Sequence, residues 1–177
     1  MKPPGRIILV VAILALLGMM GGGVYYASLD NPQLEQAQIE LSTVELRDVN
    51  TIENRATMTV AFLVTNPSDL TFTVPLIAYQ LYGDGVSLGS ASYSTEDVAM
   101  PGRAAFYPGT EIPLKNKFSF VLTDANEAVY EKIVTGQSVE YSATGMITVE
   151  SAWSIVCLLY TSPSPRDRTR SRMPSSA

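Results

Sequence analysis

The chain has 177 residues, enough for one domain with short accessory segments. It holds one cysteine and no histidine, which excludes an internal disulfide framework and removes the commonest general base and zinc ligand. The net charge is −5, and residues 28–156 carry sixteen acidic against six basic side chains, a net charge of −10. A domain this acidic repels phosphate backbones, so nucleic acid is not an expected partner.

The first predicted element is an apolar helix over residues 7–27, which follows a short basic region of residues 1–6. The helix contains no charged residue, and its length matches the bilayer's hydrocarbon core of about 30 Å. Tyr25 and Tyr26 lie where such a helix would leave the bilayer, a position that suits amphipathic aromatic rings. We therefore expect residues 7–27 to bind the lipid bilayer as a single transmembrane anchor.

The charges that flank this helix predict its direction. Residues 1–6 include Lys2 and Arg6, whereas Asp30 and Glu35 follow the helix. The positive-inside rule then predicts a single-pass protein of the cell membrane, with a cytoplasmic N-terminus and an extracytoplasmic domain. A cleaved signal peptide is the alternative, and the sequence leaves open whether this segment is cut.

Short strands are predicted beyond the anchor. Residues 28–37 are mostly polar and indicate a stalk that lifts the domain off the bilayer. After them, apolar and polar residues alternate with the period of half-buried strands. Pro75 interrupts one run, which suits an edge strand or a bulge. The predicted strands cover residues 39–46 with a register break, 57–64, 72–81, 86–91, 118–122 and a closing hairpin over 139–150.

Turn residues separate these strands. The Asn-Pro-Ser-Asp run of residues 66–69 is a strong turn signal because Asn can satisfy its own backbone and Pro prevents the strand from continuing. The Gly-Asp-Gly run of residues 83–85 predicts a hairpin. Thr144-Gly145 is the predicted turn of the closing hairpin.

One helix is predicted between the late strands. Asp124 can cap this helix over residues 125–134, and Gly136 can end it. Its apolar face would hold Ala128, Val129, Ile133 and Val134. Six or seven short strands and one helix predict a mainly β domain, an immunoglobulin/fibronectin-III-like antiparallel β-sandwich over residues 38–156. Trp153 is expected in its core.

The tail over residues 157–177 differs from everything before it. It begins at Cys157 and has two Ser-Pro steps and four arginines, without any periodicity. It resembles a translated sequencing adapter, so we expect a non-native tail that replaces the true C-terminal end of the sandwich. The alternative is a basic tail that binds RNA or acidic lipid.

The domain is similar to the WHy-type late embryogenesis abundant proteins, which are associated with water stress and hypersensitive response. The similarity covers roughly residues 36–156. The residues that carry it are Asn66 and Pro67 at a strand end, Tyr79 and Leu81 in the next strand, and Gly83 and Gly85 in the following turn. Ser68 departs from the pattern, because these proteins commonly place a second Asn there.

This resemblance implies an immunoglobulin-like sandwich without enzymatic activity that is tied to desiccation tolerance. Membrane-anchored members of the family exist. The six motif residues are interpreted as determinants of the fold and not as a binding site, because a structural turn explains Asn66 and Pro67 fully.

Few residues could carry catalysis. Glu96 and Asp97 form a carboxylate pair, but neighbours in an extended loop point apart. Lys115 or Lys117 offers only a weak Ser-Lys possibility. The turn of residues 83–85 lacks the helix and the lysine of a phosphate loop. We therefore expect no enzymatic activity, no cofactor and no metal site.

Two functions agree with these observations. The first is a membrane-anchored, non-enzymatic domain for stress or desiccation tolerance, displayed outside the cytoplasmic membrane. The second is an envelope assembly or adhesion subunit, in which the sandwich binds a protein partner through an open sheet edge.

Overall fold

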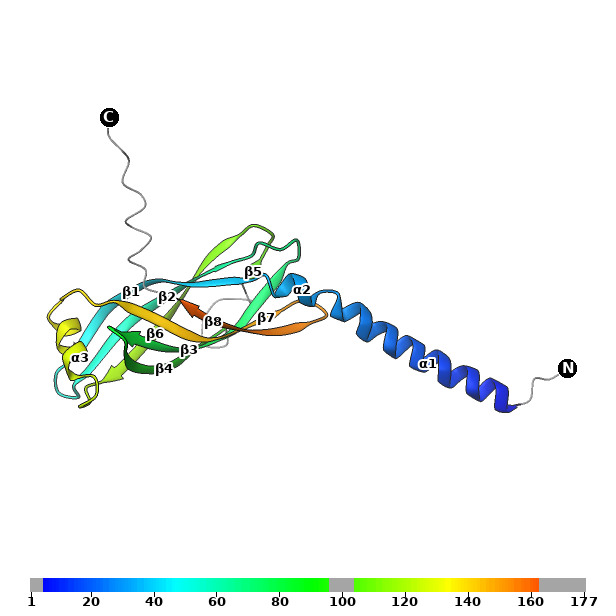
Figure 1. Ribbon diagram of the computed structural model, residues 1–177, viewed down its shortest axis with the longest axis horizontal. Helices are drawn as coiled ribbons and strands as arrows, with labels where there is room; N and C mark the ends of the chain where they lie inside the picture. The colour runs from blue at the N-terminus through cyan, green and yellow to red at the C-terminus, as the bar shows by residue number, and fades with distance from the viewer. Residues whose placement is uncertain (1–4, 96–103, 163–177) are drawn as a thin grey trace, which may run out of the picture.

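The computed structural model describes residues 5–95 and 104–162. A long helix, α1 (Gly5–Ser28), projects from one end of a β-rich body, and a short helix, α2 (Asn31–Leu34), joins the two (Figure 1). A third helix, α3 (Glu127–Val134), lies at the opposite end of this body (Figure 1). The molecule is therefore elongated, and its two ends differ in chemistry.

The body consists of two antiparallel sheets. The first sheet has three strands in the order β1 (Gln38–Asn50), β2 (Arg55–Thr65), β6 (Glu111–Val121). The second has the order β4 (Val86–Ser94), β3 (Phe72–Gly83), β7 (Tyr141–Glu150), β8 (Ile155–Ser162), with the short β5 (Ala105–Phe106) paired to β3. This arrangement confirms the predicted fold class, a mainly β antiparallel sandwich with one short helix and a preceding apolar helix.

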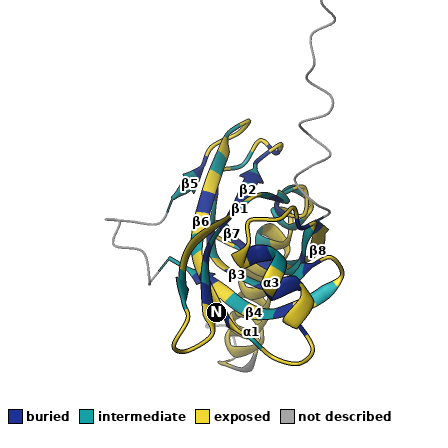
Figure 2. Cartoon of the chain, turned by 90° about the vertical axis from the view of Figure 1, so that its left-hand side faces the viewer, coloured by how far each residue is buried: buried dark blue, intermediate teal, exposed yellow. Residues whose placement is uncertain are grey.

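The core lies between the facing sheets, where alternate residues of each strand point inward (Figure 2). From β2 it takes Met58, Val60, Phe62 and Val64, all fully buried. The Phe62 ring meets the Tyr79 ring of β3 edge-on, with centroids 4.8 Å apart. The alternation of the sequence therefore decides which side of each strand faces the core.

Two predicted irregularities are present in the strands. The register of β1 against β2 shifts between Leu41 and Thr43, where a bulge was expected. The register of β3 against β7 shifts between Thr73 and Leu76, around Pro75. Because β3 has neighbours on both sides, Pro75 is accommodated by a bulge and not by an edge position.

The predicted closing hairpin is wrong. Thr144 and Gly145 lie in the middle of one continuous strand, β7, and Gly145 is paired with Tyr79 of β3. A Cβ atom on Gly145 would lie 2.1 Å from the carbonyl oxygen of Ala78. Only a glycine allows the two backbones to approach so closely. In the sequence, a glycine with this role cannot be distinguished from a glycine in a turn.

The predicted start of the late helix is also wrong. α3 begins at Glu127, so the residue at its N-cap position is Asn126 and not Asp124. The buried Asn126 side chain accepts a hydrogen bond from the Thr123 N–H (2.8 Å) and donates one to the Val121 carbonyl oxygen (3.0 Å). It therefore fixes the loop between β6 and α3. Asp124 is exposed to solvent.

The apolar face of α3 is rotated from the predicted one. Val129, Tyr130 and Ile133 are buried against the sandwich, whereas Ala128 and Val134 are exposed. The Tyr130 ring packs edge-on against a phenylalanine of β6, which explains why the helix turns this side inward.

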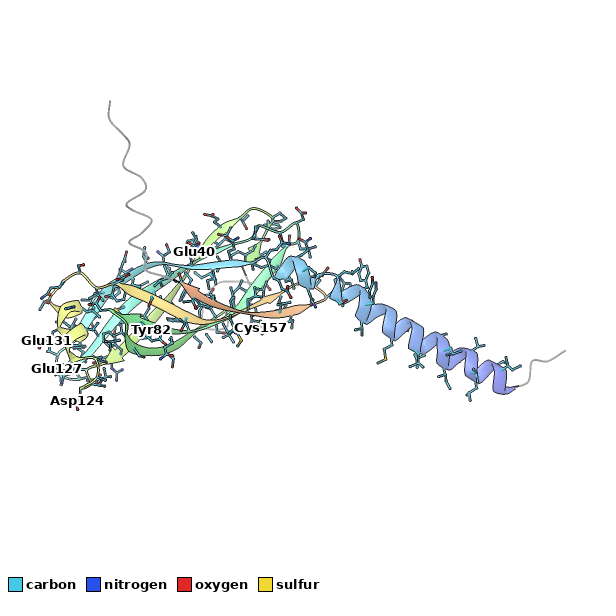
Figure 3. The ribbon with its side chains drawn as sticks, in the orientation of Figure 1. Glu40, Tyr82, Asp124, Glu127, Glu131 and Cys157 are labelled. Atoms are coloured by element: carbon cyan, nitrogen blue, oxygen red, sulfur yellow. The ribbon has the colours of Figure 1, made fainter. Side chains whose placement is uncertain are left out.

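The sandwich was expected to end at residue 156, before the tail, but it includes residues 157–162. They continue β8, which pairs with β7 along its whole length. Ser162 is buried and accepts a hydrogen bond from the Leu41 N–H (2.7 Å). Cys157 itself is exposed on β8 (Figure 3). Residues 163–177 lie outside the described residues, and the non-native origin of the tail stays a prediction.

One side chain of β8 fits its place poorly. The hydroxyl group of Tyr160 is buried between the sheets without a hydrogen-bond partner among the described residues. Burial, together with the neighbouring Tyr79, raises the pKa of this phenol. A buried hydroxyl group without a hydrogen-bond partner lowers the free energy of unfolding. A tyrosine is therefore a poor fit at this position of β8.

Gly145→Ala tests the close approach of β7 and β3. We expect it to lower the free energy of unfolding by about 3 kcal/mol, because the new methyl group would overlap the Ala78 carbonyl oxygen. Urea unfolding of the detergent-solubilised chain, followed by circular dichroism, measures the change. Thr144→Ala is the matched control, and its expected effect is within about 0.5 kcal/mol. Equal stability of the two variants would contradict the assignment.

Candidate functional site

The candidate catalytic residues do not form a site in the described structure. Glu96 and Asp97 lie outside the described residues. Lys115 and Lys117 are exposed on β6, on the side that faces away from the core. Within residues 5–95 and 104–162, no cluster of three or more Asp, Glu or Cys side chains could hold a metal ion.

Asn66 is the most highly connected polar side chain among the motif residues. It is fully buried where β2 ends. Its amide nitrogen donates hydrogen bonds to the carbonyl oxygens of Leu70 and Phe106, both at 2.8 Å. Its amide oxygen accepts from the Ser68 N–H (3.0 Å) and from the Ser68 hydroxyl group (2.7 Å). One side chain therefore satisfies four groups in two separate segments.

The backbone of Asn66 adds two further bonds to the same region. Its N–H donates to the Thr110 carbonyl oxygen (3.0 Å), and its carbonyl oxygen accepts from the Gly109 N–H (2.7 Å). Pro67 follows in an exposed position, where its missing N–H leaves no donor unpaired. The turn of residues 66–70 and the loop of residues 106–110 thus form one hydrogen-bonded unit.

Ser68 has a specific part in this unit. Its hydroxyl group reaches the Asn66 amide oxygen, and the residue is itself buried. The serine thus supplies a short donor at the position where the family pattern commonly has a second Asn. This departure from the pattern keeps the turn connected.

Tyr79 and Leu81 are core residues of β3. Leu81 is fully buried. The Tyr79 hydroxyl group accepts a hydrogen bond from the Asn116 side chain of β6 (3.0 Å), and Asn116 also donates to the Ser92 carbonyl oxygen of β4 (2.9 Å). Asn116 therefore connects the two sheets at their β4–β6 side.

Burial raises the pKa of Tyr79 to about 12, against an opposing effect of the Asn116 hydrogen bond. The unfolded chain would lose this proton near its ordinary pKa of 10.0. The contribution of Tyr79 to stability is thus complete below pH 10 and decreases as the pH rises toward 12.

Gly83 and Gly85 form the hairpin between β3 and β4, as predicted. Gly85 has a φ of 80° and Asp84 a φ of 48°, the left-handed region that such a tight turn requires. A Cβ atom on Gly83 would lie 2.8 Å from the Val129 Cγ1 of α3. The Asp84 carboxylate accepts from the Glu140 N–H (2.8 Å) and pairs with Lys132 (2.8 Å).

The six motif residues do not form one site. Asn66 and Pro67 lie at the α2 end of the sandwich, whereas Gly83 and Gly85 lie at the α3 end (Figure 1). Figure 3 shows Asp124, Glu127 and Glu131 at this α3 end. The motif residues are thus distributed along the fold, and their role as determinants of the fold stays a prediction.

Sequence reasoning missed an uncharged outer surface on the second sheet. Three cross-strand rows lie side by side there, with Ser94, Leu76, Thr148 and Cys157 in the first, Ser92, Ala78, Met146 and Leu159 in the second, and Ser90, Gln80, Thr144 and Thr161 in the third. None of these twelve residues is charged. The lack of charge at alternate positions of several strands was visible in the sequence, but the strand order that unites them was not.

A shallow groove of about 880 Å³ crosses this outer surface. It is lined by residues of β3, β4, β7 and β8, among them Met146 and Leu159. Leu159 is 87% exposed. The lining residues carry no charge, and the groove is shallow, so its shape suits a protein surface better than a small charged ligand.

No protein-family model and no curated protein sequence matches the chain. Solved structures do match. A solution structure of a protein from Arabidopsis thaliana has a TM-score of 0.51 at 14% identity and covers 70% of this chain and 76% of that one. A protein assigned provisionally to the late embryogenesis abundant proteins has a TM-score of 0.42 at 13% identity, over 92% and 91% of the two chains.

A crystal structure of a protein from Archaeoglobus fulgidus has a TM-score of 0.41 at 14% identity, over 71% and 94% of the two chains. At these identities the likeness to the Arabidopsis thaliana protein shows a shared fold and nothing about function. The two lower scores add nothing to it.

Asn66→Asp tests the buried amide. The substitution removes two donors and places a carboxylate beside two carbonyl oxygens, so we expect a loss of about 3 kcal/mol or more in unfolding free energy. Asn50→Asp is the matched control. The Asn50 amide oxygen accepts from two backbone N–H groups in the β1–β2 turn, and a carboxylate keeps both bonds.

Urea unfolding of both variants checks this prediction, with an expected effect within about 0.5 kcal/mol for Asn50→Asp. If Asn66→Asp proved as stable as Asn50→Asp, the buried amide would not be a determinant of the fold.

Proposed function

We propose that the chain is a membrane-anchored, non-enzymatic domain for stress or desiccation tolerance of the WHy late embryogenesis abundant type, held outside the cytoplasmic membrane. The main support for the anchoring is that α1 is apolar and is not covered by the rest of the chain. Its mean hydropathy reaches 2.6, and none of its most apolar stretch is buried by the rest of the chain. A helix that is apolar on every face and has no protein cover requires a nonpolar solvent, and a bilayer supplies it.

The proposed orientation rests on charge. Lys2 and Arg6, which precede the apolar run, favour the cytoplasm, and the strongly acidic domain comes after it. An uncleaved α1 fits this proposal better than a signal peptide, because a cut after Ala27 would place the bulky Tyr25 where the cleavage site needs a small residue.

The stress-tolerance part rests on the motif residues. The Asn66 turn and the Gly83–Gly85 hairpin match the family pattern in sequence, and each has a structural role in a sandwich of the expected class. The absence of histidine from the chain supports a non-enzymatic role.

Gene deletion with complementation tests the proposed function. Cells without the gene should survive drying less well, and the full chain should restore survival. A version that exports residues 29–177 without α1 should restore less, because it would not remain at the membrane. Alkaline extraction of membranes provides the control, since the full chain should stay in the pellet and the shortened one should be released. Unchanged survival after deletion would contradict the stress role.

A second candidate function is supported by the uncharged groove on the outer sheet surface. An envelope assembly or adhesion subunit would use this surface, or the open edges of β4 and β8, to bind a protein partner.

A photo-cross-linking residue at Met146, which lines the groove, tests this candidate in intact cells. A partner in constant ratio to the chain is the expected result, and it should disappear when the same residue is placed at exposed Ile52 in the β1–β2 turn. Identical products from both positions would count against a specific docking surface.

A further inference from the structure

The segment between the anchor helix and the sandwich is not a stalk. α1 ends at Ser28, and a hydrogen-bonded turn follows it, in which the Leu29 N–H donates to the Tyr26 carbonyl oxygen (3.2 Å) and the Asp30 N–H to the Ala27 carbonyl oxygen (3.4 Å). Leu34, in α2, is fully buried in the core of the sandwich. The predicted stalk over residues 28–37 is therefore not a free spacer, because Asp30, Asn31 and Leu34 contact the domain. The residues of this segment that stay exposed are Ser28, Leu29, Pro32, Glu35 and Gln36.

This packing brings the sandwich close to the membrane surface. Asp30, which contacts the domain, lies three positions beyond Ala27, where the predicted membrane span ends. Three residues of helix rise by about 5 Å. The headgroup layer on each side of a bilayer is itself roughly 5–8 Å thick. The end of the sandwich that carries α1 must therefore reach the headgroups.

The loop between β7 and β8 lies at this level (Figure 1). The Ser151 hydroxyl group donates a hydrogen bond to the Asp30 carboxylate (3.0 Å), and the Ser154 hydroxyl group bonds to the Asn31 side chain. The Ser151 oxygen also accepts from the backbone N–H groups of Trp153 and Ser154. The loop is thus a closed turn that is held against the end of the anchor.

Trp153 is at the tip of this turn. It was expected in the core, but its side chain is 70% exposed. The turn explains this exposure, because the side chains of Ser151 and Ser154 bond to the end of the anchor and the indole between them has no place in the core. An exposed tryptophan is uncommon on a water-facing surface and common at membrane interfaces.

We infer that the sandwich rests directly on the bilayer, with Trp153 inserted in the headgroup layer as a second lipid contact beside α1. This contact rests on the proposed anchoring. Its protein surface is the β7–β8 turn, and its partner is the lipid at the boundary between headgroups and acyl chains. Two attachment points fix the domain's tilt. The α3 end, with its acidic residues, then faces away from the membrane.

The chain's single tryptophan makes a direct test possible. The full chain is reconstituted in vesicles of phosphatidylcholine and phosphatidylglycerol, and the Trp153 emission is recorded. Nitroxide labels on the lipid, placed either near the headgroup or near the end of the acyl chain, act as quenchers. We expect blue-shifted emission, and quenching about twofold stronger by the shallow nitroxide than by the deep one, the pattern of an interfacial ring.

A relocated tryptophan is the matched control. In the double variant Trp153→Phe, Val134→Trp the only indole lies on α3, at the far end of the molecule, where Val134 is 37% exposed. This indole should be quenched by acrylamide in the water and by neither nitroxide. If Trp153 behaves like the α3 indole while the chain floats with the vesicles, the surface contact is refuted and the anchor stands. If the chain does not float with the vesicles, the anchor and the contact are both refuted.

Discussion

The arrangement of the whole molecule depends on how the residues after α1 are attached to the sandwich. Leu34 is buried in the core, and Asp30 is bonded to the β7–β8 turn. Burying a leucine side chain contributes about 2 kcal/mol to the stability of the attachment. The polar contacts of Asp30 fix the direction of α1 relative to the sandwich. A flexible linker would leave the domain free to move over the membrane. This attachment instead makes the anchor and the domain one unit, so that the helix direction decides which end of the domain meets lipid.

The Asn66 turn belongs to the same end of the molecule. The Asp69 N–H in this turn reaches the Gln33 side chain of α2 (3.4 Å). The turn that carries the family resemblance therefore contacts the segment that carries the anchor. Its fully satisfied buried amide keeps the loops on this end ordered, which is the condition for a defined contact with α2.

Sequence patterns predicted the features that depend on neighbours along the chain. The alternation in β2, the bulge at Pro75 and the hairpin at Gly85 are local properties, and all three are present. The errors concern partners distant in sequence. Gly145 was interpreted as a turn residue because the feature that requires a glycine there, the β3 backbone, is more than sixty positions away in the sequence. Trp153 was assigned to the core because its apolar character alone does not reveal that the turn faces outward.

Amide hydrogen exchange over residues 29–37, in the full chain embedded in lipid nanodiscs, tests the central claim most directly. The Leu34 N–H donates to the Asp30 carbonyl oxygen (3.0 Å), and the Ala37 N–H donates to the Leu34 carbonyl oxygen (3.1 Å), beside a fully buried side chain. The account predicts that these amides exchange as slowly as those of β1. Exchange at the rate of an unstructured peptide would show a free stalk and would contradict it.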